Sequence, residues 1–127
     1  MSAQVFQITV FEDGGAYVMG RVLGNAGTAI TQATISGITY YINDLFDGSV
    51  VVASTALTVS SVVFDTYQTS DPRWTEDTTG YNFATALPAG SFPSGNRVSL
   101  VTFKFDPVSG EDFYMQVKAT VLEVLGS

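Results

Sequence analysis

The chain has 127 residues, a net charge of −7 and neither cysteine nor histidine, and it is long enough to bury the core of one domain. The missing cysteine excludes disulfides and thiolate zinc sites, and the missing histidine excludes Ser-His-Asp and Cys-His catalytic systems. The five basic residues are spread along the chain, which argues against binding to nucleic acid or to an anionic membrane.

Apolar residues at every second position predict β-strands along the whole chain, and no segment keeps a helical period. The clearest hairpin joins residues 97–105 to 113–121 through a turn that contains proline and glycine. No linker or repeat divides the sequence, so we expect one domain over residues 1–127. Eight or nine short strands of this kind predict an all-β, two-sheet antiparallel sandwich. The predicted extended segments are 4–11, 17–23, 29–32, 34–43, 50–53 as an edge strand, 57–59, 62–64, 81–87, 97–105 and 113–121.

A corner is predicted where the segment Asp77-Thr-Thr-Gly-Tyr-Asn-Phe83 passes from a polar loop into a strand. Tyr81 follows Gly80 and lies two residues before an apolar core position. This is the spacing of the tyrosine corner in immunoglobulin-like Greek-key sandwiches, where the phenol bonds back to the backbone. We therefore expect Asp77, Gly80 and Tyr81 to form a structural corner in a fold of that type.

The surface is predicted to be poor in charge. Charged residues make up 13% of the chain, against about 25% in a typical domain. A neutral Ser/Thr/Gly surface explains part of this, but surfaces that bind other subunits are also depleted in charge. We favour coverage by protein partners. The candidate contact residues are Val5, Phe6 and Ile8 near the N-terminus, Leu122, Val124 and Leu125 near the C-terminus, and Trp74 in the long loop.

The long polar connection from 65 to 80 carries the acids that a glycosidase or a sugar-binding site needs. Two carboxylates flanking a glycosidic bond suffice for hydrolysis, and aromatic rings off the main core face offer stacking platforms. The alternative is structural: Asp71-Pro72 begins a turn, Trp74 pins the loop, and Asp77 caps the corner. The residues concerned are Asp65, Asp71, Glu76 and Asp77, with the aromatic residues Tyr41, Tyr67, Trp74 and Phe92.

Calcium binding is a more plausible use of the same loop than hydrolysis, because hard oxygen ligands are what the loop offers. The acidic loop and the turn Asp44-x-x-Asp47-Gly48 supply oxygen ligands, although neither has the D-x-D-x-D-G spacing of a dedicated calcium loop. We predict no cofactor and keep calcium as an alternative to ordinary turn aspartates.

The segment Gly20-Arg-Val-Leu-Gly-Asn-Ala-Gly-Thr-Ala-Ile30, followed by Ala33-Thr-Ile35, resembles the opening strands of small immunoglobulin-like and carboxypeptidase-regulatory-like modules. As a whole, the cysteine-free sandwich, with no signal peptide visible after Met1, is similar to accessory virion proteins of tailed phages. These include capsid decoration (cement) proteins and modules of the neck and tail. The resemblance implies no catalytic residues and a role in assembly.

We therefore expect a non-enzymatic structural protein of a phage virion, such as a capsid decoration protein. It would be assembled in the host cytoplasm and would bind the major capsid protein or other virion subunits, and it would form a homo-oligomer. A carbohydrate-binding or adhesion module that uses the 65–80 loop, with or without calcium, is the first alternative. A neck or tail accessory protein is the second.

Overall fold

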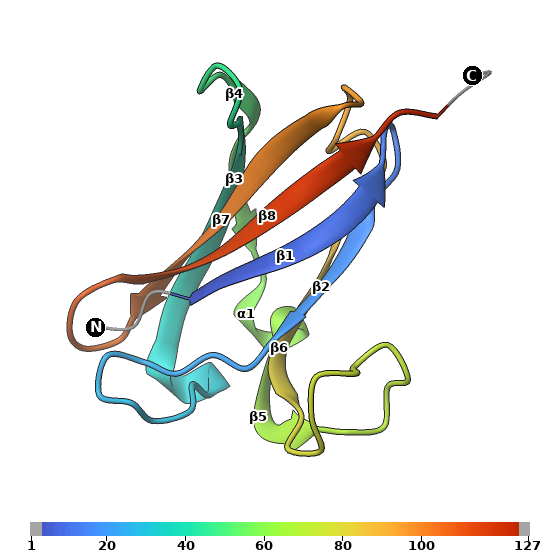
Figure 1. The fold of residues 1–127 in the computed structure, drawn as a ribbon. Helices are drawn as coiled ribbons and strands as arrows, with labels where there is room; N and C mark the ends of the chain where they lie inside the picture. Colours follow the sequence, from blue (N-terminus) through green and yellow to red (C-terminus); the bar gives the residue numbers. More distant parts are fainter. Residues whose placement is uncertain (1–3, 125–127) are drawn as a thin grey trace.

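Two β-sheets face each other in the computed structural model, which describes residues 4–124, with only the backbone described for residues 4–6 (Figure 1). One sheet has five strands in the order β1-β8-β7-β3-β4, and the other has three in the order β2-β6-β5. All pairs are antiparallel except β1 with β8. The strands are β1 (Gln4–Phe11), β2 (Ala16–Gly20), β3 (Ile35–Asp44), β4 (Val50–Leu57), β5 (Val63–Gln68), β6 (Tyr81–Leu87), β7 (Arg97–Pro107) and β8 (Phe113–Leu122).

This architecture confirms the predicted all-β class, a sandwich of two mainly antiparallel sheets. The chain crosses between the sheets after β1, β2, β4 and β6. The last strand, β8, comes back to pair with the first, β1. The predicted edge strand is found in β4, which lies at the end of its sheet. Within residues 4–124, no helix is long and apolar enough to cross a membrane.

Phenylalanine rings join the two sheets. Phe83 of β6 contacts Phe103 and Phe105 of β7 in edge-to-face geometry, with ring centroids 5.2 and 5.3 Å apart. Phe105 stacks on Phe113 of β8 at 5.2 Å. Phe92 is fully buried although it lies in a loop, so the prediction that it lies off the core is wrong.

Several predicted boundaries differ from the structure: β4 continues to Leu57, and β5 continues to Gln68, so the long loop begins at residue 69 and not at 65. The second strand ends at Gly20 because the backbone of Val22 pairs with the side chain of Asn82, through bonds of 2.7 and 3.0 Å. Residues 29–32 form only a bridge from Ala29 to Leu23, followed by a 3-10 turn, η1 (Gln32–Thr34). The predicted strands 57–59 and 62–64 are interrupted by α1 (Val59–Val62), a single turn that brings Val62 into the core.

Candidate functional site

Asp71 and Arg73 form a local turn in the loop of residues 69–80. The Arg73 backbone N–H donates to the Asp71 carboxylate at 2.9 Å, and the Arg73 guanidinium bonds both carboxylate oxygens, the shortest at 2.7 Å. The guanidinium also lies 3.7 Å from the centre of the Tyr17 ring on β2. These bonds hold the pKa of Asp71 at about 2, and the side-chain bond to Arg73 is the largest cause. The loop is thereby attached to the three-stranded sheet.

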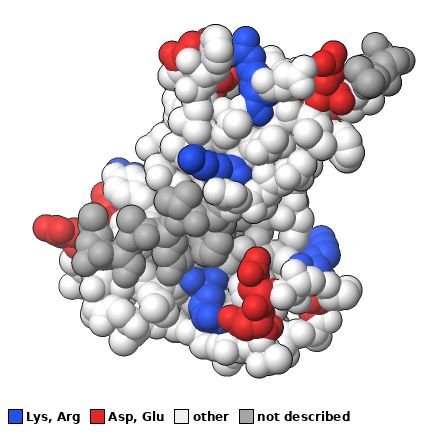
Figure 2. Space-filling view, viewed as in Figure 1, with Lys and Arg blue, Asp and Glu red and all other residues white. Residues whose placement is uncertain are grey.

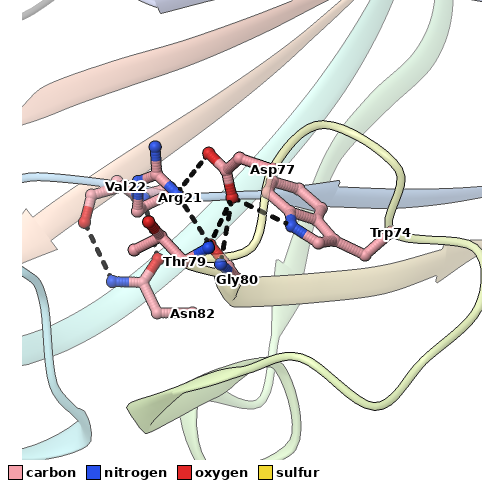
Figure 3. A network of polar contacts seen from close by, with 7 residues as sticks. All are labelled: Arg21, Val22, Trp74, Asp77, Thr79, Gly80 and Asn82. Atoms are coloured by element: carbon pink, nitrogen blue, oxygen red, sulfur yellow. Dashed lines mark hydrogen bonds and ion pairs between the residues drawn. The ribbon is translucent and has the colours of Figure 1, made fainter.

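Asp77 is the centre of a second set of bonds in the same loop (Figure 3). One carboxylate oxygen accepts the backbone N–H groups of Thr79 and Gly80, both at 3.1 Å, and the Nε1–H of Trp74 at 3.2 Å. The other oxygen lies 2.7 Å from the guanidinium of Arg21, which also donates to the Gly80 carbonyl. The backbone bond from Gly80 is the main reason why the pKa of Asp77 is lowered. Asp77 thus caps the backbone of the corner, and Trp74 holds the loop in place, as the structural alternative predicts.

The corner itself differs from a tyrosine corner. Tyr81 is buried and its ring contacts Phe64 and Trp74, but its hydroxyl bonds to nothing among residues 4–124. Tyr81 also begins β6, whereas the tyrosine corner of immunoglobulin domains begins the penultimate strand, here β7. The predicted phenol–backbone bond is therefore wrong, and the Asp77 carboxylate fastens this corner. Gly80 is required, because its φ is +102° and a Cβ there would overlap the Gln68 carbonyl oxygen.

Three of the four acids of the 65–80 region, Asp65, Asp71 and Asp77, are bonded within the fold. The Asp65 carboxylate accepts the backbone N–H of Gln32 at 2.7 Å, at the start of η1. Asp71 and Asp77 have lowered pKa values, whereas a general acid needs a raised one. Glu76 is exposed in the same loop. Asp71 and Asp77 therefore lack the raised pKa of a glycosidase general acid.

The turn after β3 uses its aspartates in the same way. Asp44 pairs with Arg97 at 2.9 Å and accepts the backbone N–H of Phe46, while Asp47 accepts the backbone N–H of Ser49. Among the described residues, no group of three acidic side chains gathers into a metal site. The aspartates of this turn and of the 69–80 loop accept backbone N–H groups two residues further on, as aspartates in turns commonly do.

A different surface lies at the end of the five-stranded sheet where β1 and β8 finish and β7 begins (upper end in Figure 1). Large apolar side chains lie open to solvent there. Phe46 is 81% exposed and Phe11 is 62% exposed. We call this surface the apolar patch, and it consists of Phe11, Leu45, Phe46, Val98 and Leu122.

Strand pairing brings the patch together from four segments. Phe11 of β1 is the register partner of Leu122 of β8. The backbone N–H of Leu45 donates to the carbonyl of Val98 on β7 at 2.9 Å. A shallow groove of about 490 Å³ runs between Leu45, Phe46, Val98 and Leu122. The patch is thus one surface with a hollow in it.

Charged groups border the patch. The Arg97 guanidinium lies 4.9 Å from the centre of the Phe46 ring and pairs with Asp44. The Glu12 carboxylate accepts the backbone N–H groups of Val124 at 2.8 Å and Gly95 at 3.2 Å, which fixes the chain just after Leu122. The patch therefore has a defined shape and a border that is mainly acidic.

The predicted contact residues fall in three different places. Leu122 belongs to the patch, and Val124, 38% exposed, follows it closely. Ile8 is partly buried against the core, and Trp74 is half-buried in the fastened loop. Val5 and Phe6 lie in the first part of β1, and only their backbone is described. Leu125 lies outside the described residues.

Sequence reasoning missed Phe11, Leu45, Phe46 and Val98. An available signal was Leu45-Phe46, two large apolar residues inside an acidic turn.

A second groove, of about 470 Å³, lies at the opposite end between residues 24–30 and the β7–β8 turn, where Asn25 donates to the Glu111 carbonyl. Seven of its thirteen lining residues are Gly, Ala, Ser or Thr.

No protein-family model matches the chain, and a search of curated proteins finds no relative.

Proposed function

We propose that this protein is a non-enzymatic structural protein that binds other protein subunits through the apolar patch. Its specific form is an accessory protein of a phage virion, such as a capsid decoration protein, with the neck or tail as an alternative location. The protein would stabilise an assembled particle by burying the patch against it, because a ligand that binds only the assembled state shifts the equilibrium toward that state.

The exposure of the patch is the observation that carries this proposal. Of the eleven large apolar side chains that are exposed among the described residues, five belong to the patch. A small monomer gains nothing from two exposed phenylalanines on one surface, whereas aromatic residues are enriched at the energetic centres of interfaces. Phe46, at 81% exposure, is the best candidate for an anchor.

The distribution of charge supports the same proposal. On the face seen in Figure 2, charged side chains are separated by wide uncharged areas. The acidic border of the patch would favour a partner surface with an apolar centre and basic groups around it. It would also disfavour adsorption to nucleic acid during assembly.

The alternatives have less support. A sugar platform needs a free aromatic face, but Trp74 packs on Tyr81 and donates its Nε1–H to Asp77. Tyr67 is only 37% exposed, against 81% for Phe46 in the apolar patch. Hydrolysis is disfavoured by the lowered pKa values of Asp71 and Asp77.

The experiment is to purify virions of the phage that encodes the chain and to quantify the protein in them by mass spectrometry. We expect many copies per particle. After partial stripping, the purified protein should rebind to saturation at that same number. Absence from purified particles would refute the virion assignment, and rebinding that does not saturate would refute a specific lattice site.

A further inference from the structure

The edges of the two sheets are protected to different degrees. An exposed edge strand presents unpaired N–H and C=O groups, and proteins usually block it with charge, proline, bulges or short length. β2 has five residues, and Arg73 covers its Tyr17 ring. β5 contains Asp65 and pairs irregularly with β6. β4 is shifted in register at two places along β3.

β1 has none of these protections. It has eight residues, Gln4-Val-Phe-Gln-Ile-Thr-Val-Phe11, without charge or proline. It pairs with β8 in unbroken register from Gln4–Met115 to Phe11–Leu122. No second strand pairs with β1 in the described part of the chain, so the backbone groups on its side away from β8 have no strand partner.

We propose that this open edge pairs with the same edge of a second copy, antiparallel and about a two-fold axis, to form a dimer with a continuous sheet. Charge favours a second copy as the occupant. The chain carries a net charge of −7, yet no charged residue occurs before Glu12, so two β1 strands can lie side by side without opposing like charges. Pairing of an edge with itself also closes the assembly at two copies.

The dimer has a consequence that rests on the proposed function. A two-fold axis perpendicular to the joined sheet leaves the apolar patches of both copies facing the same side, at opposite ends of the β1 pair. Two linked patches bind a repeated surface more tightly than one, because the second contact forms at high effective concentration.

The test compares two matched double variants by sedimentation velocity and hydrogen exchange. Gln7→Glu/Thr9→Glu adds two charges to β1, where Gln7 and Thr9 are exposed. Gln116→Glu/Thr120→Glu makes the same chemical changes on β8, an interior strand whose Thr120 is the register partner of Thr9. Thermal unfolding of each variant checks that it folds, and Gln7→Glu alone replaces the β1 variant if that one does not.

We expect the unmodified protein to sediment at twice its 13.5 kDa mass, with β1 amides that become more protected as concentration rises. The β1 variant should be a monomer and the β8 variant a dimer. A monomeric unmodified protein, open-ended polymers, protection on β4 instead of β1, or a dimer that survives the β1 charges would each overturn the proposal. Rebinding to particles is measured separately, so failure of the dimer is distinguishable from failure of the proposed function.

Discussion

The 69–80 loop and the apolar patch use their side chains in opposite ways. The loop holds the residues that most suggest a function, two aspartates and the single tryptophan, and these bond to their own chain. The patch holds residues that suggest only a core, and it leaves them in water. Residue type alone therefore misleads here, and the informative quantity is whether each side chain already has a partner.

The largest stability effect expected in the 69–80 loop is at Gly80. Gly80→Ala should lower the free energy of unfolding by about 3 kcal/mol, because the left-handed backbone and the overlap with the Gln68 carbonyl act together. Gly27 is the control, since its φ is also positive but nothing lies near its missing Cβ. Gly27→Ala should cost about 1 kcal/mol by urea unfolding. Equal losses would show that the corner is not tightly packed.

Trp74→Ala should have the next largest effect, a loss of about 1.5 kcal/mol in the free energy of unfolding. It removes the ring contact with Tyr81 and the bond to Asp77. Trp74→Phe, which keeps a ring and loses the N–H, should lose less. If Trp74→Ala left stability unchanged and abolished a binding activity, the 69–80 loop would be a ligand site, contrary to the structural role assigned to it here.

Acid should weaken the loop by a smaller amount. In the folded state the pKa values of Asp71 and Asp77 lie below their ordinary value of 3.8, and that of Asp71 is about 2. Their contribution is therefore complete above pH 3.8 and is lost as the pH falls toward about 2. The melting temperature of the unmodified protein should fall more steeply over this range than that of Asp71→Asn/Asp77→Asn. Parallel curves would contradict the assigned bonds.

The smallest effect on stability is expected in the patch. Phe46→Ser should change the free energy of unfolding by no more than about 0.5 kcal/mol, since the side chain is 81% exposed. The buried Phe92 provides the contrast, and Phe92→Ser should be strongly destabilising. A large loss for Phe46→Ser would mean that the patch is part of the fold.

Much of the fold could be predicted because one face of each strand is buried. Alternation gave the bounds of β1 and β6 correctly and placed Phe103, Phe105 and Met115 in the core. The prediction of a tyrosine corner was wrong because a Gly-Tyr-x-Phe spacing can begin any strand that follows a corner. Whether the phenol finds a backbone partner depends on the neighbouring segments, which the spacing does not specify.

The candidate site was less predictable for a related reason. Leu122 was found because β8 ends with apolar residues on both faces. Phe11, Leu45 and Val98 are each unremarkable in sequence, and they become one surface only through the order of β1, β8 and β7 and the turn after β3. Low charge indicated that such a surface exists, without giving its position.

The most direct test of the central claim measures the affinity of stripped virions for two variants, Phe46→Ser and Trp74→Ala. If the patch is the binding surface, Phe46→Ser should weaken binding about 30-fold, as expected for a residue worth about 2 kcal/mol, at unchanged stability. Trp74→Ala should bind as the unmodified protein does under conditions where both are folded. Loss of binding with Trp74→Ala, together with full binding of Phe46→Ser, would contradict the account.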